Sequence, residues 1–128
     1  VARRLGLATG EAVLRLLRVR LLADRPCLLE EIWLPLDLFG PLAEGSTAEW
    51  DDLLYPMFAR RTGVHVHRAV DEIGFGVLTA AQAGHLELAA AHPCVVVQRA
   101  AHDLGGRCVE WRITRGDAHA FQYTVTIT

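Results

Sequence analysis

The sequence lacks the motifs of the common catalytic and nucleotide-binding folds. It has no GxSxG elbow, no P-loop, no GxGxxG ahead of a helix and no HExxH. No apolar run reaches the roughly 18 residues that a membrane-spanning helix needs, and no signal peptide is visible. We therefore expect no membrane partner, no cofactor and no catalytic residues of these known types.

Cysteine is scarce, and the charge is nearly balanced. Cys27, Cys94 and Cys108 are odd in number and widely spaced, which fits reduced thiols in a cytoplasmic protein better than a disulfide framework. Thirteen basic residues against 15 acidic ones give a net charge of −2. Since a nucleic-acid surface needs a basic stripe, we expect this chain to make no DNA contact of its own.

Apolar residues make up 52% of the 128 residues, enough for one domain with a single core. Strands are predicted at 12–22, 27–34, 64–76, 94–102, 107–114 and 118–127, and helical segments at 2–8, 35–42, 52–62 and from 79 to Pro93. Strands outnumber helices and hairpins dominate the connections. This order predicts an α+β fold with one mostly antiparallel sheet and helices packed against it.

The first predicted hairpin, residues 12–34, carries an arginine pair. Arg18 and Arg20 lie two apart, so they share one face of a strand. Two guanidinium groups side by side favour an anion between them, and arginine is well shaped for phosphate or carboxylate. With Glu30 on the returning strand, the pattern indicates an anion-plus-hydroxyl site. Ordinary cross-strand Arg–Glu pairing explains the same pattern.

The helix at 52–62 has a contested start. Ser46 and Glu49 resemble a capping box, but Pro56 would then fall inside the helix and break it. A start near residue 52 places Pro56 in the first turn, where proline is tolerated. Gly63 then ends the helix, and Tyr55 lies off the apolar stripe, free to line a cavity.

The predicted strand 64–76 has two ambiguous features. Gly74 and Gly76 indicate a bulge or a close approach by a ligand or backbone, or else simply a loop. Asp71 and Glu72 point to opposite faces of a strand, which favours solvated charges over an acid/base pair.

Histidine raises a metal hypothesis. His65 and His67 share one face of the predicted strand, as some metal ligands do. No cysteine or acidic residue has the spacing to complete a ligand set with them. The remaining histidines are scattered along the chain: His85, His92, His102 and His119. We therefore predict no metal site.

Several blocks occur in a recognisable order across nearly the whole chain. They are LGL-x-x-G, then LLRVRLLADRPCLLEEIWLP, LLYPMFARRTGV, HLEL, and VVVQRAAHDLGGRCVEW with a later RGD. Each block alone is a weak match, but together and in this order they resemble the sequence of the UTRA domain. This domain is the effector-sensing part of the HutC subfamily of bacterial GntR-family transcription regulators.

The resemblance implies a chorismate-lyase-like fold in which residues 1–128 form one UTRA domain with a ligand cavity. It also implies a non-catalytic role as a homodimeric ligand sensor that binds a small anionic effector, such as a sugar phosphate or an organic acid. In the full-length protein, a winged helix-turn-helix domain that precedes this one would provide DNA binding. Residues 1–128 contain no counterpart of it.

The resemblance also assigns ligand-binding roles. Arg18 and Arg20 match the R-x-R that holds the anionic group, and Glu30 and Glu110 match acidic residues that accept ligand hydroxyls. Tyr55 matches the aromatic residue of a serine-leucine-tyrosine motif.

Two departures from the family pattern bear on the effector. Leu53 replaces the serine of that motif, and the tyrosine expected between Glu110 and Arg115 has no clear match. Both favour a more apolar or a carboxylate-bearing effector over a sugar phosphate.

Two alternatives remain open at this point. A chorismate-lyase-like enzyme acting on a carboxylated substrate would also use arginine and glutamate to hold that substrate. A pure dimerisation module with a collapsed cavity would have the same block order, and a structure with no pocket beside Arg18 would favour it.

Overall fold

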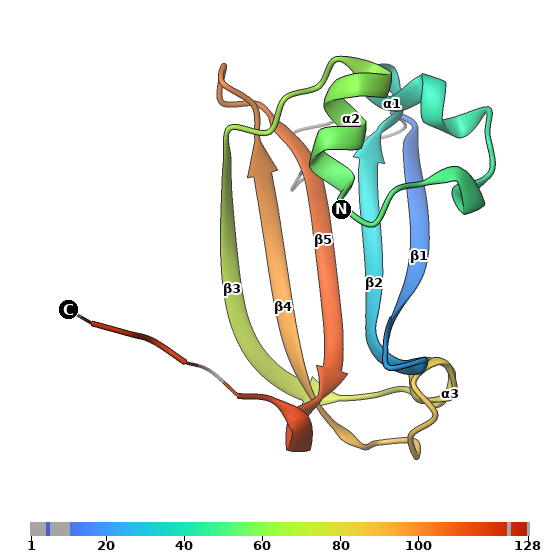
Figure 1. Ribbon diagram of the computed structural model, residues 1–128, viewed down its shortest axis with the longest axis vertical. Coiled ribbons are helices and arrows are strands. Elements are labelled where there is room, and N and C mark those ends of the chain that lie inside the picture. The colour runs from blue at the N-terminus through green and yellow to red at the C-terminus, as the bar shows by residue number, and fades with distance from the viewer. Residues whose placement is uncertain (1–4, 6–10, 123, 128) are drawn as a thin grey trace.

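The computed structural model describes residues 5, 11–122 and 124–127. Figure 1 shows a sheet with helices at both of its ends. The strands are β1 (Val13–Leu22), β2 (Arg25–Pro35), β3 (Arg68–Val77), β4 (Pro93–His102) and β5 (Cys108–Asp117). The helices are α1 (Leu36–Ala43), α2 (Leu54–Thr62) and α3 (Ala80–His85), with 3-10 turns η1 (Thr47–Glu49) and η2 (Ala118–Ala120).

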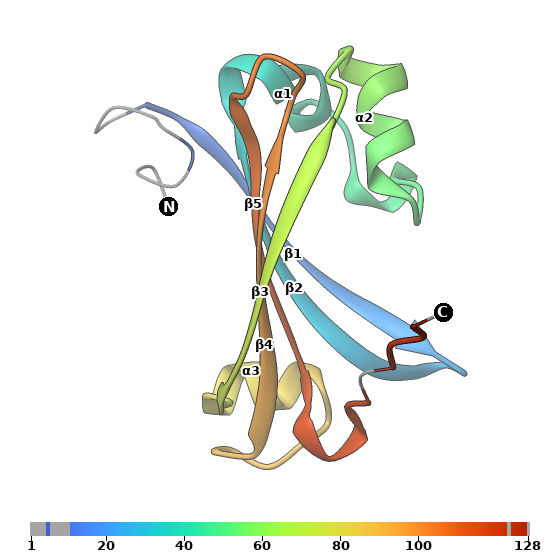
Figure 2. The same cartoon turned by 90° about the vertical axis from the view of Figure 1, so that its left-hand side faces the viewer.

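The five strands form one sheet in the order β1-β2-β5-β4-β3, and every neighbouring pair is antiparallel. This confirms the predicted α+β class. Seen edge-on in Figure 2, the strands cross one another with the twist that L-amino acids impose on a sheet. Among the described residues, no helix is long and apolar enough to span a bilayer.

The β1–β2 hairpin forms where it was predicted. Its two-residue turn consists of Ala23 and Asp24, both with positive φ (51° and 61°). Such turns match the right-handed twist of the strands. Pro26 lies in β2 opposite Leu21, just beyond a register shift, and is therefore not part of the turn.

The helices cover opposite faces at opposite ends of the sheet. At one end, α1 and α2 pack on Ile32 and Leu34, with Phe39 and Phe58 at the centre of that core. At the other end, α3 packs on Leu29, which points to the opposite face because strand side chains alternate. In Figures 1 and 2, α1 and α2 therefore lie far from α3, and the middle of the first face has no helix over it.

Both signals proposed for the α2 region are used, but in different elements. Ser46 Oγ accepts a hydrogen bond from the Ala48 amide and caps η1. The helix α2 starts separately at Leu54, so Pro56 falls in its first turn as predicted. Gly63 adopts a left-handed φ of 75° and ends α2.

Several boundary predictions were wrong. No strand forms at 118–127 among the described residues; β5 instead continues to Asp117, whose carboxylate caps η2. The helix after Thr79 has the predicted capping box but ends at His85, because Glu87 and Ala91 have positive φ. Strand β3 begins at Arg68 rather than residue 64. The helix expected at 2–8 lies outside the described residues except for Leu5.

The bulge and loop explanations for Gly74 and Gly76 both fail, whereas close approach by a ligand stays a prediction. Each glycine pairs in regular antiparallel register, with Val96 and Cys94 respectively, so the segment is neither a bulge nor a loop. The sheet's register shifts lie elsewhere, at Arg20/Leu21 and Ala101/His102.

The contrasting backbones of two glycines give a stability prediction. An alanine Cβ would meet nothing within 4 Å at Gly63 or Gly84, but only Gly63 has a positive φ. We expect Gly63→Ala to lower the free energy of unfolding by about 1 kcal/mol, because alanine is strained there. Gly84→Ala, inside α3, is the matched control and should raise it by about 0.5 kcal/mol. Urea denaturation measures both, and equal effects would contradict the backbone explanation.

Candidate ligand-binding site

The middle of the sheet face that α1 and α2 leave open carries a cluster of charges. The register places Arg18 opposite Glu30, and Arg99 opposite both Arg112 and Asp71. Arg112 also lies opposite Ile32 of the helix-covered core. The charged cluster therefore begins where the apolar core ends.

A cavity of about 250 Å³ opens in this cluster, beside the start of α2. It is lined by Arg18, Arg20, Asp52, Leu53, Leu54, Tyr55, Pro56, Arg99 and Arg112. Three of the five residues singled out from the sequence therefore share one cavity. Glu30 lines an adjoining hollow of about 320 Å³ together with Arg99 and Arg112, whereas Glu110 is fully buried.

Arg18 and Arg20 reach from β1 toward the segment that precedes α2. Arg18 Nε donates to Glu30 Oε1 at 2.9 Å, and its Nη1 donates to the Asp51 carbonyl at 3.5 Å. Arg20 donates to the Asp52 carbonyl at 3.2 Å and lies 4.0 Å from the Glu30 carboxylate. Arg18 thus forms the ordinary cross-strand Arg–Glu pair that also explained the sequence pattern. Arg20 lies farther from the Glu30 carboxylate than Arg18 does.

Arg112 joins the two buried glutamates. Its Nη1 lies 3.2 Å from Glu30 Oε2, and its Nε donates to Glu110 Oε2 at 2.7 Å. Glu110 is 0% exposed and Glu30 5%. Both carboxylates therefore act first as internal counter-ions, and only Glu30 borders a hollow that a ligand could reach.

Tyr55 connects α2 to this network. Its hydroxyl donates to Glu110 Oε1 at 2.6 Å, and the Arg112 guanidinium carbon lies 5.6 Å from its ring centroid. Burial, reinforced by the neighbouring Glu110 charge, raises the pKa of Tyr55 to about 12. The side chain is therefore a neutral donor at physiological pH.

Arg99 is the second arginine that the sequence analysis did not single out. It forms a two-pronged ion pair with Asp71 at 2.7 and 2.9 Å, and its Nη1 donates to the Tyr55 hydroxyl at 3.4 Å. The hydrogen bond from Arg99 lowers the pKa of Asp71, which is thus paired rather than merely solvated. Arg112 could have been found from the sequence, because it lies two residues after Glu110 and therefore shares its strand face. Arg99 could not, because its position beside the site depends on how β4 pairs with β5.

The electrostatics of the cluster favour an anion. Four arginines line the cavity against one carboxylate residue, Asp52. The carboxylates that pair with these arginines, Glu30, Glu110 and Asp71, do not line it. The N-cap residue of α2, Leu53, gives no side-chain hydrogen bond to the helix start, and it also lines the cavity. Unpaired amides at a helix N-terminus attract anions.

A larger cavity of about 450 Å³ lies at the α3 end of the sheet. Its lining includes Leu86, Leu88 and Phe121, with Arg25 as its one cation. None of the predicted ligand-binding residues borders it. We assign the candidate ligand site to the smaller cavity because the converging arginines are there.

Comparisons with known proteins agree with this fold. The crystallised ligand-binding domain assigned to the GntR family from Bordetella bronchiseptica aligns with a TM-score of 0.90 and 24% identity, over 100% of this chain and 79% of that one. The effector domain of PhnF from Mycobacterium smegmatis aligns with a TM-score of 0.87 and 26% identity, over 99% and 76%. The PhnF structure from the same organism gives 0.84 and 26%, over 99% and 55%. No curated protein matches.

The fold is therefore that of the effector domains of GntR-family transcription regulators. The UTRA domain family matches residues 1–122, and the chain belongs to that family. Both the predicted family and the predicted chorismate-lyase-like fold are confirmed.

The buried network predicts unequal roles for two arginines. Arg112→Leu leaves the buried Glu30 and Glu110 without their shared partner, so we expect the free energy of unfolding to fall by about 3–5 kcal/mol. Arg20→Leu is the control: this side chain is 35% exposed and should cost less than about 1 kcal/mol. Urea denaturation of both variants measures the difference, and equal losses would contradict the bridging role.

The raised pKa of Tyr55 predicts a pH dependence. Its folded pKa, about 12, exceeds the ordinary value of 10.0, so its contribution to stability is complete below pH 10.0 and is lost as pH rises toward 12. All 13 basic residues are arginine, so no lysine titrates in this window. We expect Tyr55→Phe to flatten the fall in stability between about pH 10 and pH 12, measured by urea denaturation. An unchanged slope would contradict the burial of this hydroxyl.

Proposed function

We propose that the chain is the effector-sensing, non-catalytic domain of a HutC-subfamily GntR regulator that binds a small anionic metabolite among its arginines. The observation that carries the proposal is the convergence of Arg18, Arg20, Arg99 and Arg112 on one cavity at the start of α2. Arginine forks in a partly enclosed site make strong, directional bonds to carboxylate or phosphate.

The size and lining of the cavity support a small effector. A volume of about 250 Å³ is below the usual range of drug-sized sites, roughly 300–1,000 Å³. Leu53 lines the cavity where the family pattern has serine, so one hydroxyl donor to the anion is missing. A small organic acid fits this lining better than a sugar phosphate.

The proposed mechanism starts at the segment before α2. Arg18 and Arg20 hold the Asp51 and Asp52 carbonyls at 3.5 and 3.2 Å. An incoming anion competes with these neutral acceptors and releases the segment. In a homodimer, that rearrangement would change the spacing of the DNA-binding domains that precede this one. Such a ligand acts through its different affinities for the two arrangements.

A chorismate-lyase-like enzyme is the alternative. Tyr55, which lines the cavity, has its pKa raised to about 12 and so remains protonated near neutral pH, which makes it a poor general base. The charged partners of Glu30 and Glu110 likewise commit them to structural roles. These features favour a ligand-binding role over a catalytic one. Turnover of chorismate by the purified chain would instead favour the enzyme. The cavity beside Arg18 also removes the main support for a collapsed dimerisation module.

Arg20 gives the sharpest test of the proposed site. Citrate, as a carboxylate probe, and glycerol 3-phosphate, as a phosphate probe, are titrated into the chain by calorimetry. For whichever probe binds, Arg20→Gln should weaken binding about 10–100-fold, because it removes a charge-assisted bond. Arg15→Gln is the matched control, since Arg15 lies on the same strand but pairs with Glu31 on the other face, and it should leave the affinity unchanged.

Binding that survives the double change Arg18→Ala/Arg20→Ala would contradict the proposal. Native mass spectrometry of the purified chain complements the titration, because a small acid that co-purifies with the wild type and is lost from the double variant would identify the effector class.

A further inference from the structure

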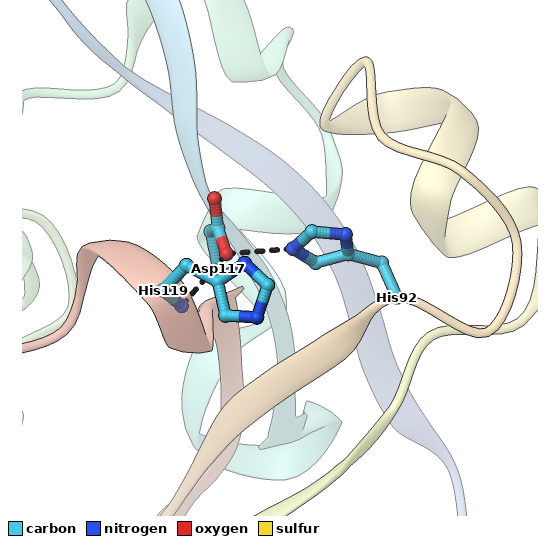
Figure 3. Close-up of side chains that lie close together, drawn as sticks. All are labelled: His92, Asp117 and His119. Atoms are coloured by element: carbon cyan, nitrogen blue, oxygen red, sulfur yellow. Dashed lines mark hydrogen bonds and ion pairs between the residues drawn. The ribbon is translucent and has the colours of Figure 1, made fainter.

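Two histidines and an aspartate that are distant in the sequence meet at the α3 end of the sheet. Asp117 ends β5 and lies opposite Cys94 near the start of β4, and His92 immediately precedes that strand. His119 follows in η2. Figure 3 shows the three side chains gathered around the Asp117 carboxylate.

The geometry of this group is compact. The His92 Nε2 atom lies 2.7 Å from Asp117 Oδ1, and the two imidazole centroids are 4.9 Å apart. One ligand atom from each residue lies within 4.8 Å of the others. A metal ion with bonds of about 2.0–2.2 Å needs its ligand atoms about 3.4 Å apart. Small side-chain rotations therefore suffice to close the group around an ion.

The backbone holds the central ligand in place. Asp117 Oδ1 accepts a hydrogen bond from the His119 amide at 2.9 Å, which caps η2 and holds the carboxylate beside the His92 ring. A simple His–Asp pair accounts for the position of His92. It does not account for His119, whose ring nitrogens make no hydrogen bond with any residue that the structure describes.

We propose that His92, Asp117 and His119 bind a divalent transition-metal ion such as Zn²⁺. Imidazole and carboxylate suit Zn²⁺, whereas Mg²⁺ and Ca²⁺ prefer all-oxygen sites with more ligands. Three protein ligands leave at least one coordination position open. Asp117 also lines the cavity of about 450 Å³, so the ion lies at that cavity's rim.

The site is independent of the arginine cavity and of the function proposed for it. Of the three ligands, none lines the cavity of about 250 Å³. A bound ion ties η2, and with it the chain that follows β5, to the start of β4.

The test is calorimetric titration of ZnCl₂ into the chain after removal of adventitious metal with EDTA. We expect one ion per chain and no binding of Mg²⁺. His119→Ala changes an exposed side chain, and Asp117→Asn keeps an oxygen to cap η2, so both variants should fold, as circular dichroism will check. Each should weaken Zn²⁺ binding at least tenfold, since loss of even an outer-shell partner typically costs roughly 10–100-fold.

The control is His65→Ala/His67→Ala, which removes two exposed histidines placed two residues apart and should leave Zn²⁺ binding unchanged. Co²⁺ gives a second readout: the wild type and this control should show the visible bands of a low-symmetry site, and His119→Ala should lose them. Absence of Zn²⁺ binding, an unchanged affinity in His119→Ala, or loss of binding in the control would each overturn the proposal. Arg20→Gln should keep the Zn²⁺ affinity of the wild type. The zinc titration therefore tests the metal proposal separately from the effector-site proposal, and either one can fail without the other.

Discussion

Two carboxylates buried in the sheet constrain everything around them. Glu30 in β2 and Glu110 in β5 are almost fully enclosed, and an unpaired carboxylate at such depth costs several kcal/mol. Arg112 joins them, and Tyr55 from α2 completes the set by donating to Glu110. The network therefore adds a polar contact to the apolar core that holds α2 against the sheet. It also determines which arginines already have a carboxylate partner.

The arginines of the site divide according to their partners. Arg112 has two buried acids and Arg99 a two-pronged bond to Asp71, so both are positioned before any ligand arrives. Arg20 has a carbonyl at 3.2 Å and a carboxylate only at 4.0 Å. Because Arg112 and Arg99 are already held in place, the site is partly pre-organised, and this lowers the entropy cost of binding a ligand. The fixed members set the shape of the site, and Arg20 is the arginine with the longest ion pair.

Local sequence patterns predicted the fold class and several turns, but they could not predict how distant strands align with one another. The hairpin at 12–34 and the stop at Gly63 follow from alternation and from glycine's freedom at positive φ. The expected strand at 118–127 failed because β-branched propensity cannot reveal whether a partner strand is present. Arg99 was missed for a related reason: its place beside Tyr55 depends on how β4 aligns with β5, which no single strand encodes. The same holds for His92 and Asp117, 25 residues apart.

The strengths of these contacts indicate where a conformational change can begin. The ion pairs of Glu30 and Glu110 lie at buried positions, so breaking them would leave an unpaired buried charge and they resist competition from a ligand. The bonds from Arg18 and Arg20 to the Asp51 and Asp52 carbonyls lie at exposed positions and reach neutral acceptors. An anionic ligand in place of these carbonyls would add the attraction of an opposite charge to the hydrogen bond that each guanidinium already makes. In the mechanism proposed above, movement driven by the ligand would therefore begin in the segment before α2, because the Tyr55–Glu110 bond anchors α2 itself.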